Sequence, residues 1–230
     1  KQRWGLLIDV SKCQDGCTAC VTACETENGW GPVKRPATDS QWIRKLTVTD
    51  PKDGSSFSMP MMCQHCANPP CVDVCPTGAS FKRADGIVLV DEDKCIGCKL
   101  CSWACPYGAR EYDAVEGVMK KCTLCVDRIY NEHIPEAQRQ PACVQACPSR
   151  ARHFGDLGDP DSAVSQLVAE REGVALMPEL GYAPVNRYLP PRPRRAGGPE
   201  QAQAEAAPGE TLDARQLNPL LRWLDRALSR

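Results

Sequence analysis

The sequence lacks most of the features that identify catalytic, nucleic-acid-binding and membrane-spanning proteins. Only 6% of its 230 residues are aromatic and three are histidines. No apolar run approaches the roughly 20 residues that span a bilayer. There is no phosphate-binding glycine loop, no dinucleotide fingerprint and no H-E-x-x-H zinc motif. The net charge of −1 provides no basic field for nucleic acid. We therefore expect no transmembrane span, no nucleic-acid partner and no catalytic site.

Cysteine, by contrast, is abundant. All 16 cysteines fall between Cys13 and Cys147, and the residues after Cys147 contain none. A stretch so rich in cysteine is held together by covalent or metal cross-links more than by a hydrophobic core alone. The cysteines form four groups of four: Cys13, Cys17, Cys20 and Cys24; Cys63, Cys66, Cys71 and Cys75; Cys95, Cys98, Cys101 and Cys105; and Cys122, Cys125, Cys143 and Cys147.

The third group, CIGCKLCSWACP, has the spacing C-x2-C-x2-C-x3-C-P. This is the bacterial ferredoxin run, in which the fourth cysteine ligates the other cluster of a pair. Pro106 follows the fourth cysteine, and Pro76 and Pro148 occupy the same place in the second and fourth groups. Four groups then make two crosswise pairs. The spacing predicts four [4Fe–4S] clusters with all sixteen cysteines as iron ligands.

The first group departs from this spacing, because three residues instead of two separate Cys13 from Cys17. Gly16 can absorb the extra residue by adopting a conformation that other residues avoid. Cys24 differs as well, since no proline follows it. We count both Cys13 and Cys24 as ligands.

Other uses of the cysteines remain open at this point. The fourth group alone has the separated pairs of a structural zinc site, so a zinc-stabilised scaffold is one alternative. A disulfide framework suits the even count, although such frameworks are typical of shorter chains. One quartet could hold a [3Fe–4S] centre. An enzyme whose cluster performs chemistry is a further alternative.

Several side chains beside the cysteines have expected secondary roles. His65 lies within a complete quartet, so we expect it to donate a hydrogen bond to sulfide instead of binding iron. Trp103 and Tyr107 are expected to shield a cluster from water. Positive charge at Lys99 and at Lys120–Lys121 would favour reduction of a nearby cluster.

The remaining pattern predicts an α+β fold. Extended runs are expected at WGLLIDV, IVLV and QWIRKLTVTD, with a hairpin turn at Asp85–Gly86 and a helix at SAVSQLVAEREG. Two ferredoxin-like modules, each with two clusters, small hairpins and short helices, would occupy residues 1–190. A Pro-, Ala- and Gly-rich linker is expected over 191–216 and an amphipathic docking helix over 217–230.

The motifs CVDVCPTGA, CIGCKLCSWACPYGAR, KCTLCVDR and PACVQACPSRARHFGDLGDP resemble a known family. They are similar to the iron–sulfur beta subunits of the dimethyl sulfoxide, polysulfide, tetrathionate and sulfite oxidoreductases, and the resemblance extends over about residues 4–190. Subunits of hydrogenase, nitrite-reductase and sulfate-reduction complexes are similar too. The resemblance implies two pseudo-symmetric modules, a molybdenum bis-pterin catalytic subunit and a polytopic, quinone-reactive membrane subunit as partners. The chain would be a peripheral membrane protein on an undetermined face, because the sequence starts at Lys1 without an export signal.

The resemblance also implies which cysteines share a cluster, pairing the first group with the fourth and the second with the third. The four implied quartets are Cys13, Cys17, Cys20 and Cys147; Cys122, Cys125, Cys143 and Cys24; Cys63, Cys66, Cys71 and Cys105; and Cys95, Cys98, Cys101 and Cys75. The first would face the catalytic subunit and the last the membrane. The implied function is a non-catalytic relay of single electrons in sulfur-compound respiration or oxidation, with a free polyferredoxin as an alternative.

Overall fold

The computed structural model describes residues 1–29, 39–49, 51, 54 and 56–191. The predicted docking helix over 217–230 and nearly all of the predicted linker over 191–216 lie outside the described residues. Within the described part of the chain, no helix has the length and apolar character needed to cross a membrane.

The largest sheet is built around the first strand of the chain. β1 (Trp4–Asp9) lies between β8 (Arg152–Asp156), which runs antiparallel to it, and β9 (Arg187–Leu189), which runs parallel. Its residues Leu6 to Ile8 have no solvent exposure. A continuous apolar run of this kind is typical of a strand that is buried on both faces. The strand expected at WGLLIDV is therefore present, and it is the central strand of its sheet.

Helix α6 (Ala163–Glu170) packs on this sheet, where Val164 joins Leu7 and Leu189 in a small apolar cluster. Ser162 caps the helix, since its Oγ accepts a hydrogen bond from the backbone N–H of Ser165 at 3.2 Å. The close approach requires Gly155 in β8, because a Cβ at that position would lie 2.7 Å from the Val164 side chain. The helix expected at SAVSQLVAEREG is thus confirmed.

The remaining strands form three antiparallel hairpins. They are β2 (Ile43–Thr49) with β3 (Ser56–Met62), β4 (Ser80–Lys82) with β5 (Val88–Val90), and β6 (Glu111–Asp113) with β7 (Val118–Lys120). The turn expected at Asp85–Gly86 joins β4 to β5, and Gly86 has a φ of +87°, which favours glycine. The strand predicted at QWIRKLTVTD is β2.

The helices that contain or directly follow a cysteine are short. They are α1 (Ala19–Glu27), α2 (Pro70–Asp73), α3 (Leu100–Ala104), α4 (Val126–Ile129) and α5 (Ala142–Gln145). Three 3-10 turns complete the elements: η1 (Val10–Lys12), η2 (Glu136–Gln138) and η3 (Pro178–Leu180). Helices of four or five residues do not form alone, so packing and bound groups must hold them.

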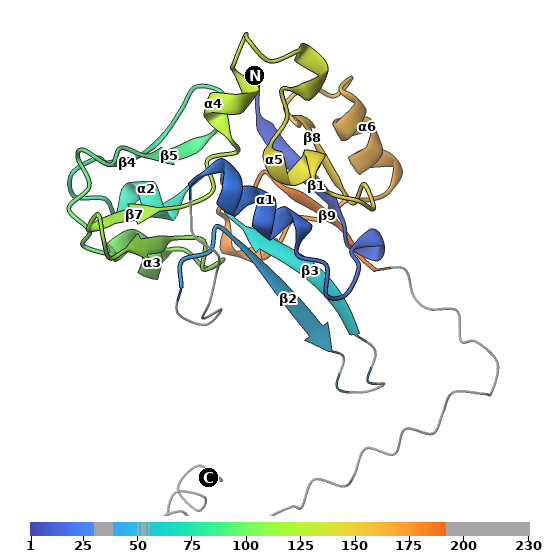
Figure 1. Cartoon of the computed structure of the whole chain (residues 1–230), viewed down its shortest axis with the longest axis horizontal. Helices are drawn as coiled ribbons and strands as arrows, with labels where there is room; N and C mark the ends of the chain where they lie inside the picture. The colour runs from blue at the N-terminus through green and yellow to red at the C-terminus, as the bar shows by residue number, and fades with distance from the viewer. Residues whose placement is uncertain (30–38, 50, 52–53, 55, 192–230) are drawn as a thin grey trace, which may run out of the picture. The chain divides into compact units, whose positions relative to one another are not determined.

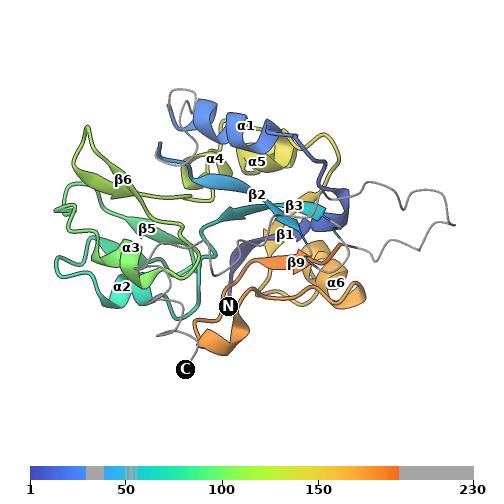
Figure 2. The same ribbon diagram turned by 90° about the horizontal axis from the view of Figure 1, so that it is seen from below.

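Figure 1 shows these elements gathered in two parts. The sheet region comprises β1, β8, β9, α1, α5 and α6, and the hairpin region comprises β4 to β7, α2 and α3. The view in Figure 2, turned by 90°, keeps the two regions apart, with the β2–β3 hairpin on the side of the sheet region. The structure is therefore a mixed fold of small sheets and short helices, as the α+β prediction states.

Candidate metal centres

Two pairs of helices bring the cysteine groups together. α1, which carries Cys20 and Cys24, packs against α5, which carries Cys143. α2, with Cys71, packs against α3, with Cys101. The first group therefore lies beside the fourth, and the second lies beside the third.

One cavity in the hairpin region is lined by four cysteines, namely Cys63, Cys66, Cys71 and Cys105. Tyr107 and Arg110 complete part of its wall. Three of the cysteines belong to the second group, whereas Cys105 is the last member of the third group. The cavity thus gathers the quartet that the family resemblance implies.

A second cavity shows the reciprocal exchange and is lined by Cys75, Cys95, Cys98 and Cys101. Here three cysteines come from the third group, and Cys75 is the last member of the second. Met119 and Arg110 also line this cavity. Arg110 therefore belongs to the walls of both cavities.

A third set of cysteines lies in the sheet region around Cys24. Burial raises the pKa of the Cys24 thiol, and the nearby thiolates of Cys122, Cys143 and Cys125 raise it further. Burial likewise raises the pKa of Cys125 to about 11. Such thiols are protonated at pH 7 by themselves, and metal binding would have to displace their protons. The structure thus places Cys24 of the first group among three cysteines of the fourth.

The first implied quartet is only partly brought together. Burial raises the pKa of Cys13, Lys45 lowers it, and the charge of Cys20 raises it, so Cys13 and Cys20 are neighbours. Gly16 has a φ of +72°, which is the conformation expected for the extra residue in this loop. The grouping of Cys17 and Cys147 with these two residues stays a prediction.

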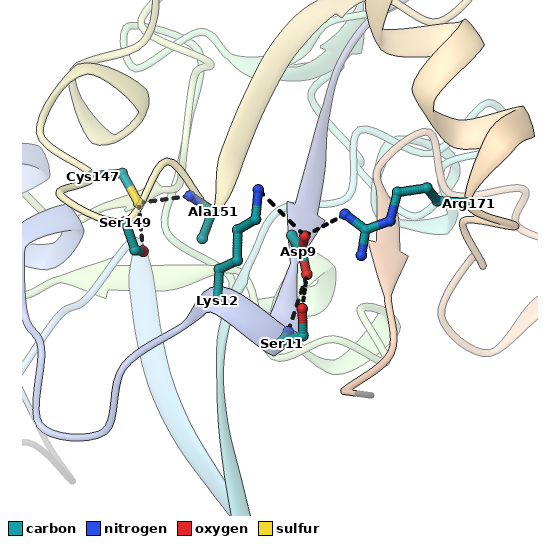
Figure 3. Close-up of polar contacts among 7 residues, drawn as sticks. All are labelled: Asp9, Ser11, Lys12, Cys147, Ser149, Ala151 and Arg171. Atoms are coloured by element: carbon teal, nitrogen blue, oxygen red, sulfur yellow. Dashed lines mark hydrogen bonds and ion pairs between the residues drawn. The ribbon is translucent and has the colours of Figure 1, made fainter. Parts of the chain in front are cut away.

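Backbone N–H groups donate hydrogen bonds to the sulfur atoms of Cys75 and Cys147, the last cysteines of the second and fourth groups. The N–H of Ser80 lies 3.3 Å from Cys75 Sγ, and the N–H of Ala151 lies 3.3 Å from Cys147 Sγ. The Ser149 hydroxyl lies 3.7 Å from Cys147 Sγ, as Figure 3 shows. Burial acts to raise the pKa of Cys147, but these hydrogen bonds outweigh it and the pKa is lowered. The turn after the cysteine therefore stabilises a thiolate.

This turn is anchored to the first strand at Asp9, whose side-chain contacts are drawn in Figure 3. The backbone N–H of Asp9 donates to the Ala151 carbonyl oxygen at 2.7 Å. The fully buried Asp9 carboxylate accepts hydrogen bonds from Ser11 Oγ at 2.5 Å and from Arg171 Nη1 at 2.6 Å. The strand, the turn that carries Cys147 and the end of α6 are thus held by one polar network.

Three of the large side chains that are buried near the cysteines carry positive charge. They are Arg110, Lys121 and Arg152, each at most 4% exposed. Sequence reasoning noted Lys121 but missed both arginines. One signal could have found them, because Arg110 and Arg152 each stand five residues after the cysteine of a Cys-Pro pair.

The expectation for the two aromatic residues is half wrong. Tyr107 is buried, lines the first cavity and donates its hydroxyl to the Leu176 carbonyl oxygen at 3.2 Å. Trp103 is 83% exposed and shields nothing. It follows Ser102 on the outer side of α3, whereas Cys101 of the same helix is buried.

The donors present fit iron–sulfur clusters. In such a cluster each iron takes one cysteine, so four thiolates surround a cavity instead of converging on one ion. Consistently, no three His, Cys, Asp or Glu side chains within the described ranges are placed to bind a single metal ion. The buried Nε2 of His65 and Nη1 of Arg110 have no hydrogen-bond partner among the described residues, and both can donate to sulfide.

Comparison with known proteins agrees with this chemistry. Residues 55–157 match the model of the 4Fe-4S dicluster domain. The chain is 52% identical over 202 residues to the B subunit of sulfite dehydrogenase from Allochromatium vinosum, covering 83% of this chain and 84% of the relative. It is 38% identical to the B subunit of tetrathionate reductase from Salmonella typhimurium, with 82% and 73% covered. It is 37% identical to the Hdr-like menaquinol oxidoreductase iron-sulfur subunit 1 of Archaeoglobus fulgidus, with 80% and 82% covered. The chain therefore belongs to this family of 4Fe-4S electron-transfer subunits of oxidoreductases.

Proposed function

We propose that the chain relays single electrons through four [4Fe–4S] clusters, each held by three cysteines of one group and one of its paired group. One observation carries the proposal: the two cavities of the hairpin region exchange Cys75 and Cys105 between them. The surroundings of Cys24 support the same exchange in the sheet region. The four quartets are those that the family resemblance implies.

The clusters would supply the one-electron chemistry, and the chain's own residues would bind and insulate them. The cysteine thiolates are the ligands. Backbone N–H groups such as that of Met119, 3.3 Å from Cys95 Sγ, stabilise the thiolate charge. Tyr107 and Val88 exclude water from one cavity wall. With every iron fully ligated by cysteine there is no open position for a substrate, so we propose a non-catalytic subunit.

We propose two pseudo-symmetric modules in residues 1–190, one built from the first and fourth groups and the other from the second and third. The helix pairs α1–α5 and α2–α3 support this symmetry. So do the equivalent turns after Cys75 and Cys147, in which Thr77 and Ser149 place hydroxyls 3.7 Å from the sulfur. The linker over 191–216 and the docking helix over 217–230 remain part of the proposal.

The partners that we propose are a molybdenum bis-pterin catalytic subunit and a quinone-reactive membrane subunit, with the chain peripheral to the membrane. The names of the relatives support subunit roles in sulfur-compound oxidoreductases and in a menaquinol oxidoreductase.

The surface around Cys98 supports docking of one partner. Cys98 is itself exposed, and Ile96, Leu100 and Trp103 around it are exposed apolar side chains. Clustered apolar side chains that remain exposed are typical of interaction sites. A cluster held by Cys98 would therefore lie near the protein surface, where a docked partner could exchange electrons with it. We propose that the membrane subunit docks here.

Replacing Cys98 with Ser tests the assignment of the third group. The Cys98→Ser variant should lose or convert one cluster and interrupt quinone-linked turnover in the complex. Metal analysis and electron paramagnetic resonance (EPR) spectroscopy of anaerobically purified protein measure this, with Val115→Ser, at an exposed position, as the matched control. Four unchanged cluster signals and unchanged turnover in Cys98→Ser would show that Cys98 is not a ligand. Zinc in place of iron would select the scaffold instead.

A further inference from the structure

Arg110 lies between two of the proposed clusters. It lines both cavities of the hairpin region, and its Nη2 donates to Cys71 Sγ and to Ser80 Oγ, each at 2.7 Å. Burial acts to lower the pKa of Arg110, but the thiolate charges of Cys71, Cys63 and then Cys101 raise it overall. Cys71 and Cys101 belong to different cavities, so the guanidinium contacts one quartet and feels the charge of the next.

Arg152 has the equivalent place in the sheet region. Its Nη1 donates to Cys143 Sγ at 3.3 Å, and its Nη2 has no partner among the residues that the structure describes. Burial acts to lower the pKa of Arg152, but the charges of Cys143 and Cys20 raise it. Cys143 belongs to the quartet around Cys24, and Cys20 belongs to the first quartet. Arg152 therefore lies between these two.

Lys121 lies at the remaining junction. It is 2% exposed, and its Nζ donates to the carbonyl oxygens of Val88 and Cys122. Burial lowers the pKa of Lys121, and Arg110 acts in the same direction. The cysteines that most strongly act to raise it are Cys63, in the first cavity, and Cys122, in the quartet around Cys24. These two cysteines belong to different regions of the molecule.

The three cations share an unusual electrostatic situation. No carboxylate within the described ranges forms an ion pair with Arg110, Lys121 or Arg152. A buried charge without a counter-charge is costly. The groups near these cations that can carry negative charge are the cysteine sulfurs, which would be thiolates when a cluster is bound. The cations and the quartets thus neutralise one another.

We propose that Arg152, Lys121 and Arg110 stand one at each junction between successive clusters and raise the reduction potentials of the two clusters that they flank. The inference rests on the proposed function, because it requires clusters in the quartets. Reduction adds negative charge to a cluster, and a nearby cation stabilises the reduced form. In a buried site this interaction is screened little by solvent and salt. Because each cation lies between two clusters, it raises the potentials of both.

The test is a redox titration of the cluster-loaded chain in its purified complex, followed by EPR spectroscopy, with no need to assign the signals beforehand. Arg110→Gln should lower two midpoint potentials, and Arg152→Gln should lower the other two. Lys121→Gln should lower one potential from each of these sets. Lys120→Gln is the matched control, because the charge of the neighbouring Lys120 is paired with three carboxylates. It should shift none.

Three readouts separate the possible failures. Four cluster signals with unshifted potentials in all three variants would overturn the role of the cations and leave the relay intact. Equal shifts of all four potentials in every variant would also overturn it. Absence of iron–sulfur signals from the unaltered chain would defeat the proposed function itself. If the Arg110→Gln variant loses iron, the Arg110→Lys variant is titrated in its place. Lysine keeps the positive charge but moves that charge away from Cys71. The same two potentials should then fall by a smaller amount, and unchanged potentials would contradict the inference.

Discussion

The sheet region and the hairpin region surround their cysteines in different ways. The sheet region has a strand buried on both faces, a nine-residue helix and a covering helix. The hairpin region has strands of three residues and helices of four and five residues. Its Cys98 is exposed, whereas Cys143 in the sheet region is buried. The buried strand of the sheet region belongs to an apolar core that extends to Ile87, Tyr107 and Ala109 of the hairpin region. The hairpin region adds a smaller cluster, in which Val88 and Met119 pack around two of its cysteines.

Removing the clusters should have the largest effect and should affect the two regions differently. Structural metal sites in small domains contribute on the order of 10 kcal/mol to folding. Without iron we expect the hairpin region to lose its structure, because its short elements have few other contacts. The sheet region should keep part of its structure. Limited proteolysis of the iron-free chain should cut first within residues 63–120. First cuts within β1 or β8 would contradict the expectation.

Replacing Leu6 with Ala tests the apolar core of the sheet region. Leu6 is fully buried in β1, so the Leu6→Ala variant should lose about 2–5 kcal/mol of folding free energy through lost contacts and a cavity. Val115→Ala in the hairpin region is the control, because Val115 is 96% exposed and its loss should change stability by less than about 0.5 kcal/mol. Thermal unfolding of the loaded proteins measures both. Equal melting temperatures for the two variants would refute the contribution of Leu6 to the apolar core.

The exposed apolar side chains of the hairpin region should matter for assembly instead of folding. Trp103→Ala should leave the iron content and melting temperature unchanged and weaken binding of the membrane subunit. A loss of about 2 kcal/mol, typical of an interface tryptophan, corresponds to roughly thirtyfold in Kd. Leu180→Ala, at a comparably apolar exposed position after β8 and α6, should not affect binding. Retained affinity in Trp103→Ala would remove this surface from the interface.

The smallest effect concerns an ion pair in each region. Burial acts to raise the pKa of Asp9, but the Ser11 hydrogen bond and Arg171 lower it overall. A carboxylate with a lowered folded-state pKa adds stability above its unfolded pKa of 3.8, and this stability is lost as the pH falls through the folded value. Arg171→Gln should therefore cost about 1–2 kcal/mol at pH 7 and progressively less below pH 4.

The matched change in the hairpin region is Lys94→Gln. The Lys94–Asp91 pair is solvent-exposed, so its loss should change stability little. Melting temperatures measured between pH 4 and 7 compare the two variants. A cost for Lys94→Gln as large as that for Arg171→Gln would show that burial does not distinguish the two pairs.

Features with short-range signals could be predicted from the sequence. The cysteine spacing and the Asp85–Gly86 turn are encoded within a few residues, and so is the buried run of β1. Long-range features could not. No local sequence pattern indicates that β9 pairs in parallel with β1, because these are the last and the first strands of the described chain. The exposure of Trp103 depends on which side of α3 faces inward, and short helices give too few turns to show that.

The site was predictable to a similar degree. Group membership followed from spacing, because a tight loop can supply only neighbouring ligands. The buried positions of Arg110 and Arg152 could not be predicted from the sequence, since isolated arginines are usually exposed. Their shared position, five residues after the cysteine of a Cys-Pro pair, is visible only when the two motifs are aligned. Which cysteines accompany Cys147 depends on tertiary packing and not on local sequence.

The pairing of β1 with both β8 and β9 has a consequence for biogenesis. During synthesis, β1 leaves the ribosome well before β8 and β9, and neither neighbour exists until residues 152–189 have been translated. The sheet region therefore remains open until β9 has emerged. Iron–sulfur assembly factors would consequently meet a polypeptide that already contains all four cysteine groups, and loading of the sheet-region sites would follow the synthesis of β9.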